Sequence, residues 1–442
     1  MTATLGLAGL GLAIREAPVR VRSGRVVKLV GTLIEAELPG ARMGEVCHVD
    51  GGGPAETVGF REHHALLMPF GSVDGVRFGA SVRTSGEMPE VPVGWALRGR
   101  VIDGFGQPMD GKGPLGPLPR RPLHAPPPDP LLRGLIRKPL ETGVRLLDGM
   151  LTFGRGQRVG LMAGSGVGKS TLMGMIARRS NADVNVIALI GERGREVREF
   201  LEDVLGPEGL ARSIVVCVTS DRAPVLQVRG AFVAATIADW LRDQGQDVML
   251  FMDSVTRLAM AQRQIGLAAG EPPTTKGYTP SCFALLPRLL ERAGPGIEGE
   301  SAAGKGGGSV TALYTVLVDG DDMQDPIGDA VRGIVDGHIV LSRRIAAQGQ
   351  FPAVDVLQSI SRVMSTVAPR AHVEVATRAR RLLATWAENE ELVRLGAYRA
   401  GASAEVDAAI ARIEPIRAWM RQSVDEHVPI AAAVAGLEKA LG

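Results

Sequence analysis

Residues 163–170 read Ala-Gly-Ser-Gly-Val-Gly-Lys-Ser and carry the residue types that bind phosphate. They follow an apolar run, 158–162, which we expect to be a buried strand, and precede 171–178, which we expect to open a helix. Between a strand and a helix, the glycines let successive backbone N–H groups face one anion, and the helix amino terminus adds the positive end of its dipole. The pattern therefore predicts a P-loop that binds nucleotide phosphates.

Single residues of this loop have separate tasks. The Lys169 ammonium can reach the β- and γ-phosphates, and the Ser170 hydroxyl can ligate Mg²⁺. Ala163 stands where such loops usually have their first glycine; because this position leaves the strand, a methyl group there is a small steric change. We expect the nucleotide to contact Gly164, Ser165, Gly166, Val167, Gly168, Lys169, Ser170 and Thr171.

Two acidic residues follow apolar runs downstream of the loop. Asp253 ends the run 249–253, and we expect it to hold Mg²⁺ through water. Glu192 follows the run 184–190 and is the candidate group that orients and polarises the water attacking the γ-phosphate. Arg193 beside it could neutralise phosphate charge, although residues 192–196 could equally form a solvated loop whose charges pair with one another.

Apolar runs alternate with helical patterns from about residue 131 onward. Strands buried on both faces are uniformly apolar, as in a parallel sheet covered by helices. The sequence therefore predicts an α/β fold with a RecA-like P-loop NTPase core over residues 94–366. The expected strands are 184–190, 214–218, 248–252, 311–318 and 338–341, and the expected helices are 197–205, 231–244 and 283–292.

Two smaller domains are expected on either side of this core. Residues 24–93 contain short β-type runs between glycines and predict an N-terminal β-barrel, preceded by a flexible or partner-ordered arm, 1–23. A strand is expected at 95–102, and the Pro- and Gly-rich stretch 104–130 predicts an extended connector without packed elements. Residues 367–442 lack strand patterns and predict a C-terminal helical domain.

The helical domain is expected to contain helices over 371–388 and 404–423, the second interrupted by Pro415. Glycines at 396 and 401 would separate the two helices. The apolar side chains expected in its core are Leu382, Leu383, Trp386, Leu392, Leu395, Ile410 and Ile413.

Composition excludes several classes of function. Fifty basic and 48 acidic residues leave a net charge of +2, and aromatic residues make up only 4%, so neither an electrostatic footprint nor a stacking platform for nucleic acid is expected. Cys47, Cys217 and Cys282 are widely spaced, as reduced thiols of a cytoplasmic protein would be. The apolar start of the chain lacks the basic flank of a signal peptide, and no run reaches the ~20 apolar residues of a membrane span, so neither segment is expected.

Several longer motifs resemble those of the rotary ATPase superfamily. Residues 191–197, 278–281 and 351–355 are similar to that superfamily as a whole, and further stretches resemble, more narrowly, the type III secretion and flagellar export ATPases. The further stretches are 252–257, 261–263, 266–273, 286–294, 320–323 and the P-loop itself, including Ala163. The resemblance extends over nearly the whole chain from about Gly24 and is strongest between 139 and 362.

The resemblance implies a homohexameric ring that hydrolyses ATP with Mg²⁺. It assigns Glu192 to activation of water and Arg193 to the γ-phosphate in the same subunit. Phe351 matches the aromatic residue that packs on adenine, although from the residues alone it reads as a core aromatic before a proline. Arg362 matches an arginine finger that reaches the neighbouring subunit's nucleotide, although by itself it reads as a solvated charge. Asp321 and Asp322 are candidates for sensing the γ-phosphate.

The resemblance also implies a function. The expected protein is an ATPase that energises type III export, most of all of flagellar components, by unfolding substrates or releasing their chaperones. Its implied partners are stator or regulator and central stalk proteins, export substrates, chaperones and the membrane export gate, at the inner face of the cytoplasmic membrane. The alternatives are a virulence-type secretion ATPase, a rotary synthase catalytic subunit and a hexameric RNA helicase; balanced charge and scarce aromatics argue against the last.

Overall fold

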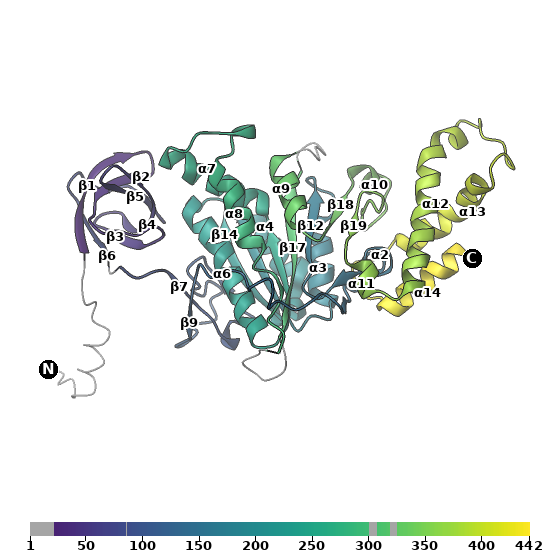
Figure 1. Ribbon diagram of the computed structural model, residues 1–442, viewed down its shortest axis with the longest axis horizontal. Coiled ribbons are helices and arrows are strands. Elements are labelled where there is room, and N and C mark those ends of the chain that lie inside the picture. Colours follow the sequence, from purple (N-terminus) through teal and green to yellow (C-terminus); the bar gives the residue numbers. More distant parts are fainter. Residues whose placement is uncertain (1–21, 85, 300–306, 319–324) are drawn as a thin grey trace.

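The computed structural model describes residues 22–84, 86–299, 307–318 and 325–442. Three parts follow one another along its longest axis: a barrel, a central sheet flanked by helices, and a group of helices that contains the carboxyl terminus (Figure 1). Residues 1–21 of the expected arm, and Asp321 and Asp322, lie outside the described residues. The fold class expected from the sequence is confirmed.

The N-terminal part is a closed six-stranded barrel in the order β1-β2-β5-β4-β3-β6. Alternate strand residues point inward, so the interior is filled by small and branched side chains such as Val26, Ile34 and Leu67, each at most 1% exposed. The strands are β1 (Arg22–Val30), β2 (Leu33–Glu37), β3 (Val46–Val49), β4 (Gly53–Arg61), β5 (His64–Pro69) and β6 (Ser81–Thr84).

The central sheet has the strand order β19-β18-β12-β17-β15-β13-β14-β8, and β16 pairs with β17 beside this path. Its strands from β18 to β8 are parallel, and β19 pairs antiparallel with β18. The strands are β8 (Val101–Ile102), β12 (Arg158–Ala163), β13 (Val184–Glu192), β14 (Ser213–Thr219), β15 (Asp247–Asp253), β16 (Gly294–Pro295), β17 (Ser309–Leu317), β18 (Gly337–Leu341) and β19 (Ile360–Ser361).

Helices bury both faces of this sheet, which explains why its strands are apolar throughout. Along β13, Val186 and Ile190 belong to one core with α6, α7, α8 and α9, whereas Ile187 and Leu189 belong to another with α2 and α3. The helices of this part are α2 (Arg145–Met150), α3 (Lys169–Arg179), α4 (Gly194–Glu199), α5 (Gly206–Ala211), α6 (Pro224–Asp243), α7 (Val255–Ala269), α8 (Pro280–Leu290), α9 (Pro326–Ile334), α10 (Arg343–Ala347) and α11 (Met364–Val367).

Two expectations about the segments that join the barrel to the sheet are wrong. The stretch 95–102 is not one strand: Trp95–Leu97 forms a 3₁₀ turn, η1, and only Val101–Ile102 pairs with β14. The connector 104–130 does contain a packed element, because β9 (Arg120–Pro122) pairs with β7 (Glu90–Pro92) and Leu123 after it is 1% exposed. Short proline-containing strands of this kind give little periodic signal.

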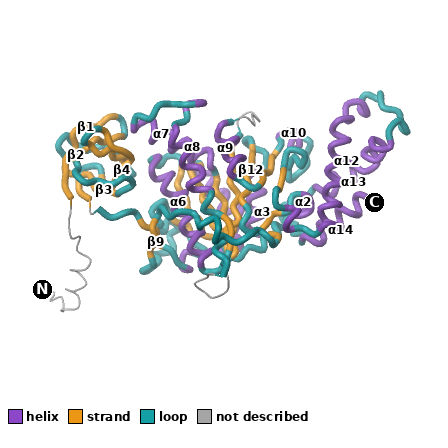
Figure 2. The backbone as a smooth tube through the Cα atoms, in the orientation of Figure 1, coloured by secondary structure: helices purple, strands orange, loops and turns teal. Residues whose placement is uncertain are grey.

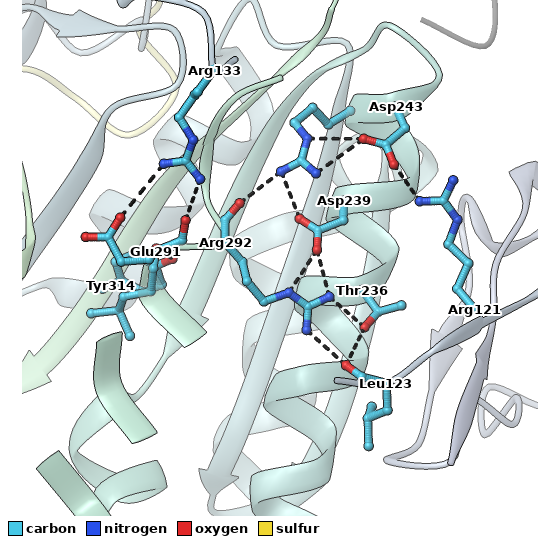
Figure 3. A network of polar contacts seen from close by, with 11 residues as sticks. Arg121, Leu123, Arg133, Thr236, Asp239, Asp243, Glu291, Arg292 and Tyr314 are labelled. Atoms are coloured by element: carbon cyan, nitrogen blue, oxygen red, sulfur yellow. Dashed lines mark hydrogen bonds and ion pairs between the residues drawn. The ribbon is translucent and has the colours of Figure 1, made fainter. Parts of the chain in front are cut away.

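A buried polar network fixes this connector to the core domain (Figure 3). The guanidinium of Arg292, 1% exposed, pairs with Asp239 of α6 at 2.7 Å and donates to the carbonyl of Leu123 at 3.0 Å and to Thr236 at 2.9 Å. Arg242 donates to the other oxygen of Asp239 at 3.0 Å. Because almost all of these groups are out of water and paired, the network holds the connector in one place on α6.

The C-terminal part consists of helices joined by loops (Figure 2). It consists of α12 (Arg370–Arg394), α13 (Ala404–Met420) and α14 (Ile430–Leu441), which pack on one another and on α2. Pro415 does not interrupt α13, because Ile413, Ile416 and Trp419 anchor that helix in the core. Leu392 and Leu395, expected in the core, are 48% and 74% exposed near the end of α12. In the described part of the chain, no helix is both long and apolar enough to cross a membrane.

Candidate nucleotide-binding and catalytic site

The loop after β12 has the backbone that phosphate binding requires. Gly166 and Gly168 have φ values of +77° and +91°, a conformation that favours glycine, and α3 begins directly after them at Lys169. Ala163 is the last residue of β12, 1% exposed, and pairs with Leu317 and Leu341 of the flanking strands. Its methyl group therefore lies within the sheet and not in the loop, which accounts for the missing first glycine.

Two carboxylates meet the P-loop lysine at the carboxyl edge of the sheet. Asp253 ends β15, is 3% exposed, forms an ion pair with Lys169 and accepts a hydrogen bond of 2.6 Å from the hydroxyl of Thr315. Glu192 ends the neighbouring parallel strand β13, is 6% exposed, and places Oε1 3.7 Å from the Lys169 Nζ. The expected strand positions thus bring three candidate residues together.

Arg257 provides a second cation beside Glu192. It lies in the first turn of α7, which begins directly after β15, and its Nε donates to the Glu192 Oε1 at 3.2 Å. Burial raises the pKa of Glu192 above its usual range, and the charge of Asp253 adds to this, while Lys169 and Arg257 oppose it. A carboxylate with a raised pKa, held by a fixed cation, is suited to accept a proton from water.

A cavity of about 600 Å³ opens over this cluster, a size within the range of small-molecule sites. It is lined by the P-loop residues 163–166 and 168–171, by Glu192, Asp253 and Arg257, and by the segment after β13. Arg193 lies on this wall with its side chain 70% exposed and pairs with Glu196 at 3.3 Å. The geometry is therefore compatible both with a later phosphate contact and with the solvated pair that the sequence left open.

The segment after Arg193 differs from the expected helix 197–205. Residues Gly194–Glu199 form α4, and Phe200–Leu205 continue as a π-helix, η2, in which Phe200 is buried and lines the cavity. π-helical turns occur frequently at functional sites. A sequence window of helical periodicity cannot distinguish this wider turn from an α-helix.

Sequence reasoning did not assign two residues of the site. Arg257 lies four residues beyond Asp253, a spacing that places it one turn into the helix after the strand, so this signal was available. Thr315 lies near the carboxyl end of β17, and its contact with Asp253 depends on β17 being the neighbour of β15. Strand order is not contained in the local pattern, so Thr315 could not be found from it.

Known proteins match this chain over most of its length. Residues 143–361 match the nucleotide-binding domain of the ATP synthase alpha/beta family, and residues 368–439 match the C-terminal domain of the type III secretion ATPase EscN. A protein named flagellum-specific ATP synthase from Bacillus subtilis is 51% identical over 95% of both chains. A type 3 secretion system ATPase from Xanthomonas euvesicatoria is 53% identical over 92% of this chain and 91% of its own.

A solved structure agrees with these matches. The assembled ATPase EscN from the type III secretion system of enteropathogenic E. coli superposes with a TM-score of 0.89, at 45% identity, over 95% of this chain and 100% of its own. The chain belongs to the flagellar and type III secretion ATPases. The resemblance stated from the sequence motifs is thereby confirmed, and the candidate site described above lies in a chain of this family.

Phe351 lies at the rim of this candidate site. Its side chain is 48% exposed, so it is not the core aromatic that its position before a proline suggests. A Cβ atom placed on Gly168 would lie 3.8 Å from Cδ1 of the ring, which puts the ring beside the P-loop. An exposed aromatic ring at this place offers a flat apolar surface next to the phosphate site.

Arg362 lies at the opposite edge of the sheet from the P-loop. It follows β19, in which Ser361 pairs with Gly337 at the beginning of β18, whereas the P-loop lies beyond Leu341 at the end of that strand. The five residues of β18 span roughly 15 Å at about 3.3 Å each. Arg362 is exposed, and its side chain forms no hydrogen bond or ion pair with any residue that the structure describes.

Proposed function

We propose that this chain hydrolyses ATP at the subunit interfaces of a homohexameric ring and so energises type III protein export, most directly of flagellar components. The observation that carries this proposal is the distribution of charges over the sheet. Lys169, Asp253 and Glu192 meet at one edge, beside a cavity large enough for a nucleotide, whereas Arg362 lies at the opposite edge of the sheet. If Arg362 takes part in the reaction, it does so in the pocket of a second copy.

The residues of one chain account for most of the reaction. Phosphate oxygens compete with Asp253 for the Lys169 ammonium, and the backbone N–H groups of residues 164–170 surround the phosphates. Glu192 accepts a proton from the attacking water, and Arg257 keeps its carboxylate in place. Arg193 reaches the γ-phosphate once its pairing with Glu196 is released.

The residues present fit a Mg²⁺ ion bound together with ATP. The Ser170 hydroxyl forms no hydrogen bond with a described residue and lies at the start of α3, and Asp253 offers a buried carboxylate aligned by Thr315. The described residues contain no group of three or more acidic, His or Cys side chains that would hold a metal alone, which suits an ion that keeps water and phosphate ligands. When bound, the ion neutralises charge on the phosphates.

Phe351 and Arg362 complete the pocket from two sides. The exposed ring of Phe351 packs on adenine, and Arg362 of one subunit enters the pocket of the next, where it stabilises charge on the transferring phosphate. Such a finger contributes on the order of 10³-fold or more in rate. Hydrolysis therefore depends on assembly of the ring.

Partners and location follow from the same proposal. A relative, EscN, has been solved in complex with its central stalk EscO. We infer that this chain also binds a central stalk protein, a stator or regulator, export substrates and their chaperones, with peripheral contact to the membrane export gate. It would act in the cytoplasm at the inner face of the cytoplasmic membrane, and nucleic acid is not among its partners.

The proposal is tested by the rate of ATP hydrolysis per chain as a function of protein concentration, read beside light scattering. We expect the rate per chain to rise over the concentration range in which light scattering shows the hexamer forming. A dispersed monomer that hydrolyses ATP at the full rate would exclude shared pockets.

A virulence-type secretion ATPase is the second candidate, favoured by the 53% identity to the Xanthomonas protein. The two are separated by expressing the chain in strains that lack either their flagellar or their secretion ATPase. Restored motility without restored effector secretion supports the flagellar function, and the reverse result supports the second candidate.

A further inference from the structure

The buried side chain of Gln422 joins three segments behind the nucleotide site. It lies in the connector between α13 and α14 and is 7% exposed. Its Nε2 donates to the carbonyls of Gly143 and Glu426, both at 2.9 Å, and its Oε1 accepts from the N–H of Arg145 at 2.7 Å. Its own main-chain N–H donates to the carbonyl of Phe351 at 3.0 Å. The residue thus attaches the loop of Phe351 to α2 and to the helical domain.

This attachment acts on Phe351 directly, through its main-chain carbonyl. Its ring is about half exposed, whereas Gln350 and residues 352–356 on either side are buried, so the hydrogen bond from Gln422 is one of several contacts that hold the loop and the one made by Phe351 itself. The side chain of Gln422 fixes its own backbone through three hydrogen bonds, and that backbone in turn holds the Phe351 carbonyl. The next residues of the connector are held by the P-loop helix, since Arg178 and Arg179 of α3 donate to the carbonyls of residues 424 and 425 at 3.2 and 3.1 Å.

We propose that Gln422 is a positioning residue for the nucleotide base. This inference depends on the proposed stacking of adenine on Phe351. Gln422 keeps the ring at the distance from the P-loop at which base and phosphates bind together. Loss of its side chain lets the loop move, so that base stacking weakens while phosphate binding at residues 164–170 is retained.

The test compares ligands with and without a base. Dissociation constants for ADP and for inorganic tripolyphosphate are measured on the full chain carrying Gln422→Met, Phe351→Ala or both. Methionine retains the length and packing of glutamine but none of its hydrogen bonds. Ser423→Ala is the matched control, because Ser423 is exposed in the same connector and its hydroxyl bonds no described residue. Thermal unfolding verifies that each variant is folded. If Gln422→Met does not fold, Gln422→Glu replaces it, because glutamate lacks the N–H groups that donate to the two carbonyls.

We expect Phe351→Ala to weaken ADP binding roughly tenfold, the lower part of the range for a lost base–aromatic stack. Gln422→Met should weaken it roughly fivefold, about the worth of one hydrogen bond, and the double variant should bind ADP no more weakly than Phe351→Ala within about twofold. Tripolyphosphate binding by these variants, and ADP binding by the Ser423→Ala control, should stay within about twofold of the parent chain.

Two failures are distinguishable. If Phe351→Ala leaves ADP binding unchanged, the proposed adenine contact is wrong. If Phe351→Ala weakens ADP binding but Gln422→Met does not, or if Gln422→Met weakens tripolyphosphate equally, the positioning role is wrong. Additive effects in the double variant also contradict it, because they would mean that Gln422 acts independently of Phe351.

Discussion

Replacement of Glu192 by glutamine should separate nucleotide binding from turnover. The amide has nearly the same size and can still accept from the Nε of Arg257, which lies 3.2 Å from the carboxylate in the native chain. What is lost is the carboxylate proposed to take a proton from water. General bases contribute typically 10²–10⁴-fold, so we expect the barrier to rise by about 3–5 kcal/mol while the Kd for ATP changes little.

The assay is steady-state phosphate release by the assembled ring, beside equilibrium ATP binding. Glu199→Gln serves as a control, since this carboxylate lies on the same cavity wall but pairs with Arg195, which has no part in the proposed reaction. Turnover of Glu192→Gln within about tenfold of the parent would fall below the range for a general base and remove Glu192 from that role.

The pH profile of the same protein tests the raised pKa of Glu192. The carboxylate must be ionised to accept a proton, so the rate should fall as the pH drops through its pKa, at a higher pH than an ordinary glutamate requires. Removal of a favourable cation raises the pKa further, so Arg257→Gln should move the acid limb to still higher pH. If the acid limb of the Arg257→Gln profile stays at the pH of the parent, Arg257 does not lower the pKa of Glu192.

The remaining predictions concern the ring and the buried network. Arg362→Ala should fold normally, because the side chain is exposed, yet lose on the order of 10³-fold in rate. Mixing it with Lys169→Ala should restore part of the activity; absence of recovery in a mixture that forms hexamers by sizing would contradict a finger supplied in trans. Asp239→Asn should lower the free energy of unfolding in urea by about 3–5 kcal/mol, because Arg292 is then buried without its counterion, whereas Asp329→Asn on the surface should cost about 0–1 kcal/mol. A loss below about 1 kcal/mol at Asp239 would show that the network is not a stabilising unit.

Most of the central domain could be predicted because its signals are local. A strand buried on both faces is apolar from end to end, and β13 is fully buried over Val184–Glu192, so the expected run 184–190 was short by only the residues nearest the site. The P-loop lies in its required strand–loop–helix context, and Asp253 and Glu192 were located because parallel strands end at one edge.

What could not be predicted depends on contacts between distant segments. β9 exists because Arg120–Pro122 finds β7, and Leu123 is buried because its carbonyl meets Arg292, some 170 residues further along the chain. Leu392 and Leu395 have core-like spacing, but α12 is longer than the helices that pack on it, so its last turn remains in solvent. The role of Gln422 likewise appears only when residues 143, 145 and 351 are brought to it.

The placement of Arg362 and the P-loop at opposite edges of one sheet has a genetic consequence. If Arg362 acts in the neighbouring pocket as proposed, a copy with a defective Lys169 damages its own pocket. A copy with a defective Arg362 then leaves its own pocket intact and disables that of its neighbour. In a cell that expresses both alleles, a finger mutant incorporated into rings of normal copies should therefore behave as a dominant inhibitor of export. The loss of export should increase with the proportion of mutant copies, because each mutant copy in a ring inactivates a pocket whose own residues are normal.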